Sequence, residues 1–557
     1  MTETILVAVA WPYANGPVHQ GQFGGAYLPA DIFARYHRTA GNRVLMVSGS
    51  DMHGTPITVR AEREGRSPEA VAEEFHASFL DTWQRMGISF DLFTSTGTAN
   101  HARVSQDVFL RLLEQGYLYE QEQELFYCET DRRFLLDRYV EGICPFCGYE
   151  PARGDQCDNC GRPQDPLKLI NPRCKFCGNV PVVRNSKHMF LRLSAFQDRL
   201  RAWLDDGVKE TYWRKNVLNF SLGMLNEGLH DNAITRDLDW GVRVPLEGWE
   251  QKRIYVWFEA VIGYLSAARE WAQIQGAPDA WKDWWEDPAA KTYYFIGKDN
   301  IWFHATIWPA MLMGHGGLNL PYDVPANQYI NISGRKSSTS QNWAVWVPDY
   351  LTRYDPDPLR YYLSAAMPET SDTDFTWAEF LRRNNDELVA TWGNLVNRVL
   401  TQFPRHFEGR VPRPDALDGR AGALIERCQQ TLETAGRELA ACRFRAGIGA
   451  GMELAREANR FLDETAPWKA IREDRQAAAN ALYAALSVIA TLRTALYPYL
   501  PFSAEKLNRL LGETRPVREL GWGLTVPEPE RPLPPPEPLF RKLDPSIVDE
   551  EEARLGT

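Results

Sequence analysis

Three Cys-x-x-Cys pairs lie between residues 144 and 177 of this 557-residue chain, and a glycine follows each pair. A glycine at that place allows the tight turn that brings both thiols of a pair to one point. Four thiolates fill a tetrahedral zinc site and leave no open position, so the metal would be structural. The pattern therefore predicts a small zinc-stabilised module inside a much larger protein.

The sequence leaves the zinc ligands partly open. The closest set of four is Cys144, Cys147, Cys157 and Cys160. Cys174 and Cys177 supply half of a second site, for which His188 and Cys128 are candidate further ligands. An interleaved pairing of the three units is another alternative. The total of nine cysteines is odd, which argues against a disulfide framework.

Composition and hydropathy narrow the class of protein. The chain has 62 basic and 73 acidic residues and a net charge of −11, which argues against a polybasic binder but leaves room for a local basic groove. The most apolar helical stretch, residues 301–313, is too short to cross a membrane and contains His304. Glu3 stands where a signal peptide would carry positive charge. We expect a cytoplasmic protein without a membrane segment.

The N-terminus reads as the first unit of a parallel α/β sheet. Residues 5–10 (ILVAVA) predict a buried strand, residues 11–17 a loop, and a helix is expected from about Phe23. Between them lies His19-Gln20-Gly21-Gln22, where a glycine and a helix start can present phosphate-binding backbone. The motif is weak on its own, because a histidine at this position is more often a helix cap.

Two further strands are expected at residues 44–47 and 293–296. Asp51 follows the first and is placed either to cap a helix or to bind an ammonium group; Gly297-Lys298-Asp299 follows the second. Residues 331–340 (NISGRKSSTS) form a basic loop rich in hydroxyl groups. Such a loop clamps phosphates or is a plain surface turn, and composition does not separate the two.

Two aromatic helix faces and a helical second half complete the pattern. Trp257, Ala260 and Tyr264 share one face, and Phe303, His304 and Trp308 share another. They are core stripes or the wall of a pocket that suits a thioether. Residues 377–511 predict a helical bundle with long helical stretches at 384–400, 421–461 and 476–496. Residues 526–538 are proline-rich and predict an extended linker before a charged tail.

The bundle carries a candidate site for single-stranded bases. Asn394 and Arg398 point the same way on one helix, and Trp468 follows Pro467 at a break between helices. An arginine and an aromatic ring on neighbouring helices can stack on unpaired bases. The alternative is a core tryptophan and a solvated arginine.

In order along nearly the whole chain, these motifs resemble methionyl-tRNA synthetases, a class I aminoacyl-tRNA synthetase family, and most closely its archaeal-like branch. The motifs that carry the resemblance are residues 12–17 (PYANGP), 51–57 (DMHGTPI), the cysteine-rich insertion, 255–257 (YVW), 297–299 (GKD), 303–304 (FH), 308–311 (WPAM), 342–347 (NWAVWV), 359–362 (LRYY), 367–370 (MPET) and 467–468 (PW).

The resemblance implies an α/β fold: a class I Rossmann-like parallel sheet with an inserted zinc-knuckle domain, followed by an α-helical anticodon-binding bundle. The implied boundaries are 1–117 and 218–325 for the two halves of the catalytic domain, 118–217 for the insertion, 326–383 for the signature-loop region that contacts the tRNA stem, 384–520 for the anticodon-binding domain and 521–557 for the linker and tail.

It also implies a two-step reaction, in which methionine and ATP with Mg²⁺ give methionyl-adenylate, and the methionyl group then passes to methionine tRNA with the anticodon CAU. The implied catalytic residues are His19, Gln22, Lys336 and Thr339, and ATP is held by Gly21, Gly297, Asp299, Lys336 and Thr339. The implied methionine pocket is Trp11, Tyr13, Asp51, Trp257, Ala260, Tyr264, Phe303, His304 and Trp308, and the anticodon readers are Asn394, Arg398, Pro467 and Trp468.

Two departures from the family signatures leave an alternative. Gln22 stands for the second histidine of the first signature, Thr339 for the second lysine of the second signature, and Gln341 for its arginine. Thr339 matches a form found in the archaeal-like branch. The alternative is a degenerate paralogue that binds RNA or senses methionine without aminoacylation. Synthetases for leucine, isoleucine or valine are disfavoured, because the insertion at 118–217 is too short for their editing domain. We expect a monomer, since the optional C-terminal dimerisation module is not found.

Overall fold

The computed structural model describes residues 2–135, 139–154, 157, 159–160, 162, 164–338, 341–417, 419–525 and 528–557. At its centre lies a five-stranded sheet in the order β14-β13-β1-β2-β3, in which all neighbouring strands are parallel. These strands are β1 (Thr4–Val9), β2 (Arg43–Ser50), β3 (Leu92–Ser95), β13 (Lys291–Gly297) and β14 (Ala326–Asn327). The three strands expected from the sequence are confirmed, and their carboxyl ends place the loops that follow them at one edge of the sheet.

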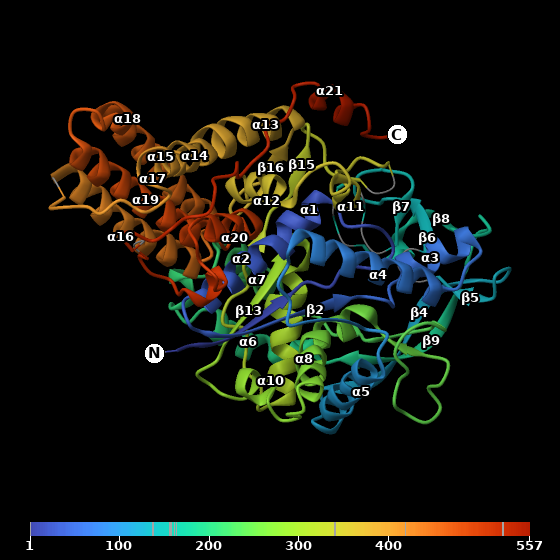
Figure 1. Ribbon diagram of the computed structural model, residues 1–557. Coiled ribbons are helices and arrows are strands. Elements are labelled where there is room, and N and C mark those ends of the chain that lie inside the picture. The colour runs from blue at the N-terminus through green and yellow to red at the C-terminus, as the bar shows by residue number, and fades with distance from the viewer. Residues whose placement is uncertain are drawn as a thin grey trace.

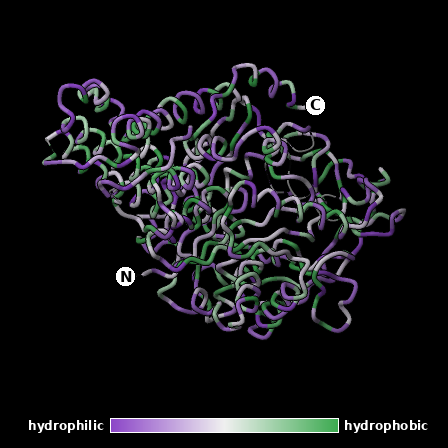
Figure 2. Tube along the Cα trace, in the orientation of Figure 1, coloured by the Kyte–Doolittle hydropathy of each residue, from purple (hydrophilic) through white to green (hydrophobic). Residues whose placement is uncertain are grey.

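Helices cover both faces of this sheet, and alternate residues of β1 show it. Ile5, Val7 and Val9 pack in one hydrophobic core with α2 (Leu28–Thr39) and α4 (Pro68–Met86). Leu6 and Ala8 pack in the other with α5 (Ala99–Glu114), α8 (Val256–Ile274) and α10 (Trp308–His315). Figure 1 shows the two layers on opposite sides of the strands, and Figure 2 shows hydrophobic residues concentrated along the central strands.

The cysteine-rich insertion extends from the sheet as a long antiparallel ladder. It pairs β4 (Leu118–Cys128) with β9 (Val182–Leu191), and β5 (Arg133–Phe134) and β10 (Asn232–Ala233) extend it on either side. A smaller sheet of β6 (Val140–Ile143), β7 (Ala152–Arg153) and β8 (Ile170–Cys174) carries the knuckles. The chain returns to the catalytic sheet through α6 (Gln197–Leu204) and α7 (Lys215–Glu227).

A helical module follows the second half of the sheet. The short parallel pair β15 (Ile330–Ile332) and β16 (Thr373–Phe375) flanks α11 (Val347–Tyr350) and α12 (Pro356–Ala365), and α13 (Trp377–Arg382) leads into the bundle. The bundle consists of a π-helix η8 (Arg383–Gly393), α14 (Asn394–Leu400), α15 (Gln402–His406), α16 (Gly419–Ala440), α17 (Phe444–Thr465), α18 (Pro467–Ala470), α19 (Arg475–Leu496) and α20 (Pro501–Leu510).

The helical stretch expected over residues 421–461 consists of two helices. The first, α16, ends before Cys442, whose φ of 54° is left-handed and turns the chain back. The sequence did not single out α19. By length and composition α19 could span a membrane, but 94% of its apolar window is buried inside the protein. Its apolar residues form the centre of the bundle, where helices pack against it on all sides.

The proline-rich segment is extended as expected, but it is not a free linker. Over the described residues 528–538 it pairs with the chain near Val411: the Val411 amide donates to the Arg531 carbonyl, and the Glu530 amide donates to the Val411 carbonyl, both at 2.9 Å. Val526 and Pro527 lie outside the described residues. Beyond it, α21 (Ile547–Glu552) buries Glu551 against Arg353 and Tyr354 of the α11–α12 region. The tail therefore crosses back over the catalytic half.

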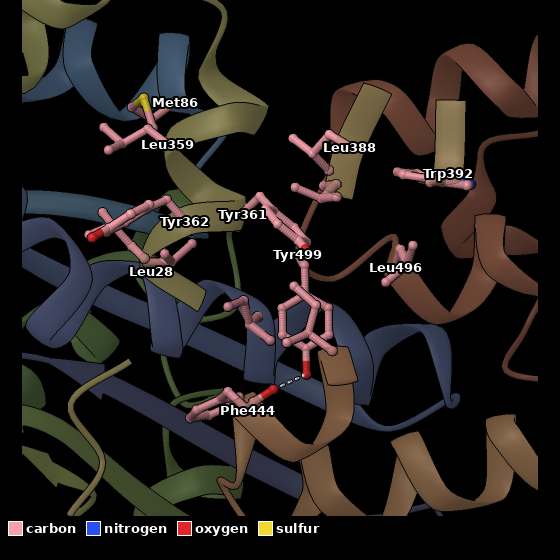
Figure 3. Close-up of a cluster of buried hydrophobic side chains, with 14 of the residues drawn as sticks. Leu28, Met86, Leu359, Tyr361, Tyr362, Leu388, Trp392, Phe444, Leu496 and Tyr499 are labelled. Atoms are coloured by element: carbon pink, nitrogen blue, oxygen red, sulfur yellow. Dashed lines mark hydrogen bonds between the residues drawn. The ribbon is translucent and has the colours of Figure 1, made fainter. Parts of the chain in front are cut away.

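One buried arginine joins the catalytic sheet to the bundle. Arg360 of α12 is fully buried and donates to Asp31 Oδ2 of α2 at 2.6 Å, to the Met86 carbonyl at the end of α4 at 3.0 Å, and to the Tyr499 and Pro498 carbonyls of the bundle at 2.7 and 3.1 Å. Figure 3 shows the apolar side chains around this junction, including the hydrogen bond from Tyr499 to the Phe444 carbonyl. The two modules thus share one core.

We expect Arg360→Met to lower the free energy of unfolding by about 3 kcal/mol, because it leaves three carbonyls and part of a buried carboxylate without a donor. The shift is measured as a change in the urea unfolding midpoint. The matched control is Arg382→Met, which removes an exposed ion pair with Glu379 and should cost less than about 0.5 kcal/mol. Equal shifts for the two variants would contradict the role given to Arg360.

Candidate active site and anticodon face

Two loops far apart in the sequence meet at the carboxyl edge of the sheet. Gln20 makes two hydrogen bonds with Val345. The backbone amide of Gln20 donates to the Val345 carbonyl at 2.9 Å, and the backbone amide of Val345 donates to the side-chain oxygen Oε1 of Gln20 at 3.1 Å. Gln20 Nε2 also donates to Ser337 Oγ at 2.9 Å. Gln20 is fully buried, so these bonds lock the His19 loop to the basic loop that contains Lys336.

His19 caps the short helix α1 (Gln20–Gln22) and has a defined tautomer. Its Nδ1 accepts the Gly21 amide at 3.1 Å, and its own amide donates to Gln22 Oε1 at 3.2 Å. Burial lowers the pKa of His19 to about 4, so the ring is neutral at pH 7. A neutral ring that accepts at Nδ1 carries its proton on Nε2. His19 is therefore both the helix cap of the ordinary interpretation and a neutral hydrogen-bond donor.

Gly21 and Gln22 fit around this ring. A Cβ on Gly21 would lie 3.0 Å from the imidazole, so the glycine leaves the histidine its space. Gln22 turns its carbonyl oxygen to the His19 amide, which leaves the side-chain NH₂ as the group available to a ligand.

A second cluster of charges lies beside the end of β13. Lys336 is exposed, and its Nζ lies 4.4 Å from the centre of the Tyr329 ring, while Lys298 Nζ lies 3.9 Å from the same ring. The Tyr329 hydroxyl donates to Asp299, and Lys298 pairs with Asp372 at 2.8 Å. Gly297, at the end of β13, has open space around its Cβ position. Thr339 lies outside the described residues, so its place stays a prediction.

Asp51 lies at the end of β2 in a largely buried position, 4% exposed. Its backbone pairs with the 12–14 loop, since its amide donates to the Pro12 carbonyl and its carbonyl accepts the Ala14 amide. In that loop Tyr13 meets Trp257 edge-on, with ring centres 6.0 Å apart. Burial and then the charge of Glu259 raise the pKa of Asp51 to about 7.

Aromatic rings from α8 and from the segment before α10 pack together beside this loop. Trp257 and Phe303 stack with ring centres 4.4 Å apart. His304 Nδ1 donates to the Asn300 carbonyl at 2.9 Å, so its Nε2 accepts the Tyr264 hydroxyl at 2.7 Å. Burial lowers the pKa of His304 to about 4, which keeps the ring neutral in this pair. The polar members of the two aromatic faces are thus satisfied, as a buried site requires.

The remaining pocket residues lie deeper. Trp308 is 1% exposed and donates to the Tyr294 hydroxyl at 3.0 Å, so it supports the wall from the core. Ala260, one turn after Trp257, is buried. Trp11 reaches across to α8, where a Cβ on Gly263 would lie 2.7 Å from its ring. The structure brings the predicted methionine-site residues to one side of the sheet edge.

The polar groups behind Asp51 were not predicted from the sequence. Glu259 is fully buried on α8, and its Oε1 lies 2.9 Å from His53 Nδ1. The signal was present, because an acidic residue between Phe258 and Ala260 falls within a run of buried apolar side chains.

Two of the anticodon candidates, Arg398 and Trp468, meet at the far end of the bundle. The Arg398 guanidinium lies 4.8 Å from the centre of the Trp468 ring and pairs with Asp463 at 2.5 Å. Asn394 is exposed one turn earlier on α14. Ala466, with φ of 39°, ends α17 and sets Pro467 at the start of α18. Figure 1 shows α18 at the end of the bundle remote from the insertion.

Two groups of side chains in the insertion have the geometry of metal sites. The Sγ atoms of Cys144, Cys147, Cys157 and Cys160 lie within 4.8 Å of one another, with Cys144 to Cys160 at 3.9 Å and Cys147 to Cys157 at 3.6 Å. Tetrahedral zinc with four thiolates requires sulfur–sulfur distances of about 3.8 Å. The residues therefore fit zinc.

The second group is Cys128, Asp131, Cys174 and Cys177. Cys128 Sγ lies 3.4 Å from Cys177 Sγ, and Cys174 Sγ lies 3.0 Å from Asp131 Oδ2. Of the two further ligands considered, the structure brings Cys128 to this group. His188 is instead bonded to Thr235 at 3.0 Å and lies 3.2 Å from Asp237. Asp131 was missed, although Cys128-x-x-Asp131 has the spacing of the other pairs.

Comparison with known proteins decides the family. The family model for class I tRNA synthetases (M) matches residues 5–400, and the model for the anticodon binding domain of methionyl tRNA ligase matches residues 411–557. This chain belongs to the class I methionyl-tRNA synthetases. A methionine–tRNA ligase of Thermomicrobium roseum is 55% identical over 100% of this chain and 99% of its own length, and one of Dehalococcoides mccartyi is 57% identical over 100% of both.

Solved methionyl-tRNA synthetases share the fold. The Mycobacterium tuberculosis enzyme in complex with methionyl-adenylate superposes with a TM-score of 0.80 and 26% identity, covering 97% of this chain and 100% of that chain. The apo form of that enzyme gives a TM-score of 0.72 and 25% identity, covering 98% of this chain and 99% of that chain. The match confirms the parallel sheet followed by the helical anticodon domain. The domain boundaries stay predictions.

We expect Gly263→Ala to destabilise this synthetase by roughly 1–3 kcal/mol, because the new methyl group would overlap the Trp11 ring. Gly223→Ala in α7 is the matched control. Its Cβ meets nothing within 4 Å, so the same change inside a helix should stabilise the protein by about 1 kcal/mol. Thermal unfolding measures whether each variant is more or less stable than the wild type. A stabilising Gly263→Ala would contradict the tight contact between Trp11 and α8.

Proposed function

We propose that this chain joins L-methionine to methionine tRNA in two steps, with the chemistry in the crevice between the His19 and Lys336 loops. The full-length similarity to methionine–tRNA ligases supports this function, and the bond from Gln20 to Ser337 is the observation that carries the site assignment. It joins the two loops that a nucleotide must contact at once.

In the first step the methionine carboxylate attacks the α-phosphate of ATP, a P–O bond forms, and the bond to pyrophosphate breaks. The step needs in-line placement and donors for the charge on the phosphorus oxygens. His19 offers the proton on Nε2, Gln22 its NH₂ group and Lys336 its ammonium. Asp299 and Asp372 are already engaged by Tyr329 and Lys298, so we assign the Mg²⁺ to the triphosphate, whose charge it neutralises.

The methionine ammonium pairs with Asp51, and the side chain lies among Trp257, Phe303 and the Tyr264–His304 pair. A pocket of this kind gains little from size alone, since one methylene is worth roughly 1–3 kcal/mol. The neutral, fixed His304 and the stacked rings favour a polarisable sulfur over a polar side chain of equal length.

In the second step the methionyl group passes from the adenylate to the terminal adenosine of the tRNA. At the other end of the molecule, Arg398 and Trp468 provide a stacked pair for the unpaired bases of a CAU anticodon, flanked by Asn394 and Pro467. The monomeric state and the cytoplasmic location stay predictions.

We expect methionine-dependent exchange of pyrophosphate into ATP, and a loss of at least about 100-fold in Lys336→Ala, because a cation beside the phosphates is removed. Lys298→Ala should lose less, since that lysine is already paired with Asp372. Gln22→His is expected to retain exchange and tests whether the amide is a working substitute. Wild-type exchange no higher with methionine than without it would leave only the paralogue that binds RNA or methionine.

We propose that both groups in the insertion hold structural zinc. The ligands of one site are Cys144, Cys147, Cys157 and Cys160, and those of the other are Cys128, Asp131, Cys174 and Cys177. When bound, zinc would crosslink the loops that carry these ligands. The chain keeps the four ligand atoms of each site at the distances from one another that zinc requires.

Freshly purified protein should therefore contain two zinc ions per chain by mass spectrometry of the metal. Cys157→Ser and Cys174→Ser should each remove one. Less than one zinc per chain in the wild type would overturn the four-cysteine site. A wild type with one zinc that survives Cys174→Ser would overturn the second site alone.

A further inference from the structure

Behind Asp51 lies a buried carboxylate that the reaction as described does not use. Glu259 has no exposed surface, although it lies on α8 between the pocket residues Trp257 and Ala260. Its Oε1 lies 2.9 Å from His53 Nδ1. Its Oε2 lies 3.6 Å from His101 Nε2 and makes no hydrogen bond among the described residues. Burying a charged carboxylate costs free energy of folding unless a hydrogen-bonded or oppositely charged partner offsets it.

His53, the partner of Glu259, also contacts Asp51. The backbone amide of His53 donates to Asp51 Oδ1 at 3.1 Å, so one residue touches both carboxylates. The same loop is held on its other side, where Trp240 Nε1 donates to the Met52 carbonyl at 2.6 Å and the Trp240 ring meets His53 edge-on. Glu259 therefore ties the Asp51 loop to α8, and both elements carry residues of the proposed methionine site.

His101 cannot donate freely to Glu259. The Ser266 hydroxyl donates to the Gly263 carbonyl at 3.0 Å, so it accepts from His101 Nδ1 at 3.0 Å. The remaining ring nitrogen, Nε2, lies 3.2 Å from Ser105 Oγ, closer than to Glu259. The charge of Glu259 is thus shared mainly with His53, and part of it remains to act on Asp51.

We propose that Glu259 is a positioning residue for the methionine ammonium group, acting through His53 on both the place and the charge of Asp51. The proposal rests on the function proposed above. The part of the Glu259 charge that His53 does not neutralise adds to the attraction of Asp51 for a cation, and the ammonium of methionine is the cation that enters.

The charged and titratable groups around Asp51 give the pH dependence a sign. They are Glu259 on α8, His53 on the same loop, His101 on α5, His76 bonded to Ser50, and Arg253, which acts on His53. The pKa of Asp51 is about 7, raised by burial and then by the charge of Glu259, while the backbone hydrogen bond and the charge of His53 lower it. Below that pH Asp51 is protonated and loses its attraction for ammonium, so methionine should bind less tightly as the pH falls.

The test is calorimetric titration of the full chain with L-methionine from pH 5.5 to 8.5. The wild-type Kd should rise as the pH falls through about 7. In Glu259→Gln the Kd at pH 8 should rise about tenfold, while kcat and the KM for ATP in pyrophosphate exchange stay within about twofold. The pH midpoint of the Kd should move down by about one unit, because the stronger of two opposing charges is lost. A merely structural role would not move the midpoint.

Two further variants keep the outcome decisive. Glu259→Asp keeps the charge and should keep the wild-type midpoint even if its Kd rises. Glu270→Gln removes a carboxylate farther along α8 that is bonded to Thr94, and should leave both Kd and midpoint unchanged. An unchanged midpoint and Kd in Glu259→Gln overturn the proposal. If Glu259→Gln does not fold, a shifted midpoint in Glu259→Asp overturns it. A wild type without methionine-dependent exchange would instead overturn the proposed function.

Discussion

The buried guanidinium of Arg360 is the contact on which the architecture depends. A charge without exposed surface is stable only if it is well paired, and here four hydrogen bonds reach Asp31, the end of α4 and two carbonyls of the bundle. Catalytic sheet, α12 and bundle therefore form one continuous core. The packing of this core sets the distance between the His19 loop and Trp468.

Near the His19 and Lys336 loops, burial and hydrogen bonding also distinguish side chains that hold elements together from side chains that are exposed. Gln20, Glu259 and His304 are buried and bonded, so they hold elements together. Lys336 is exposed and rests on Tyr329, so it is available to a phosphate. Three segments are π-helical. Phe23–Tyr27 follows the His19 loop, Phe303–Ile307 carries the ring of Phe303, and Arg383–Gly393 precedes Asn394. Such widened turns often occur at functional positions.

Sequence reasoning succeeded where the signal is local. Buried β-branched runs predicted β1, β2 and β13, and cysteine spacing predicted the four-cysteine group, which the structure assembles. It failed where the partner is distant. The ladder between β4 and β9 decides that Cys128 and Asp131 meet Cys174, and α8 decides that Glu259 meets His53. The turn at Cys442 was missed because a left-handed cysteine has no sequence signal, unlike glycine. The roles of the site residues come from family resemblance and stay predictions.

The most direct test of the account is a crystal structure of this chain with a non-hydrolysable analogue of methionyl-adenylate. The account predicts the ammonium about 3 Å from Asp51, the thioether against Trp257 and Phe303, and the phosphate substitute beside His19 Nε2. An analogue bound outside the crevice, or inside it with its ammonium directed away from Asp51, would contradict it.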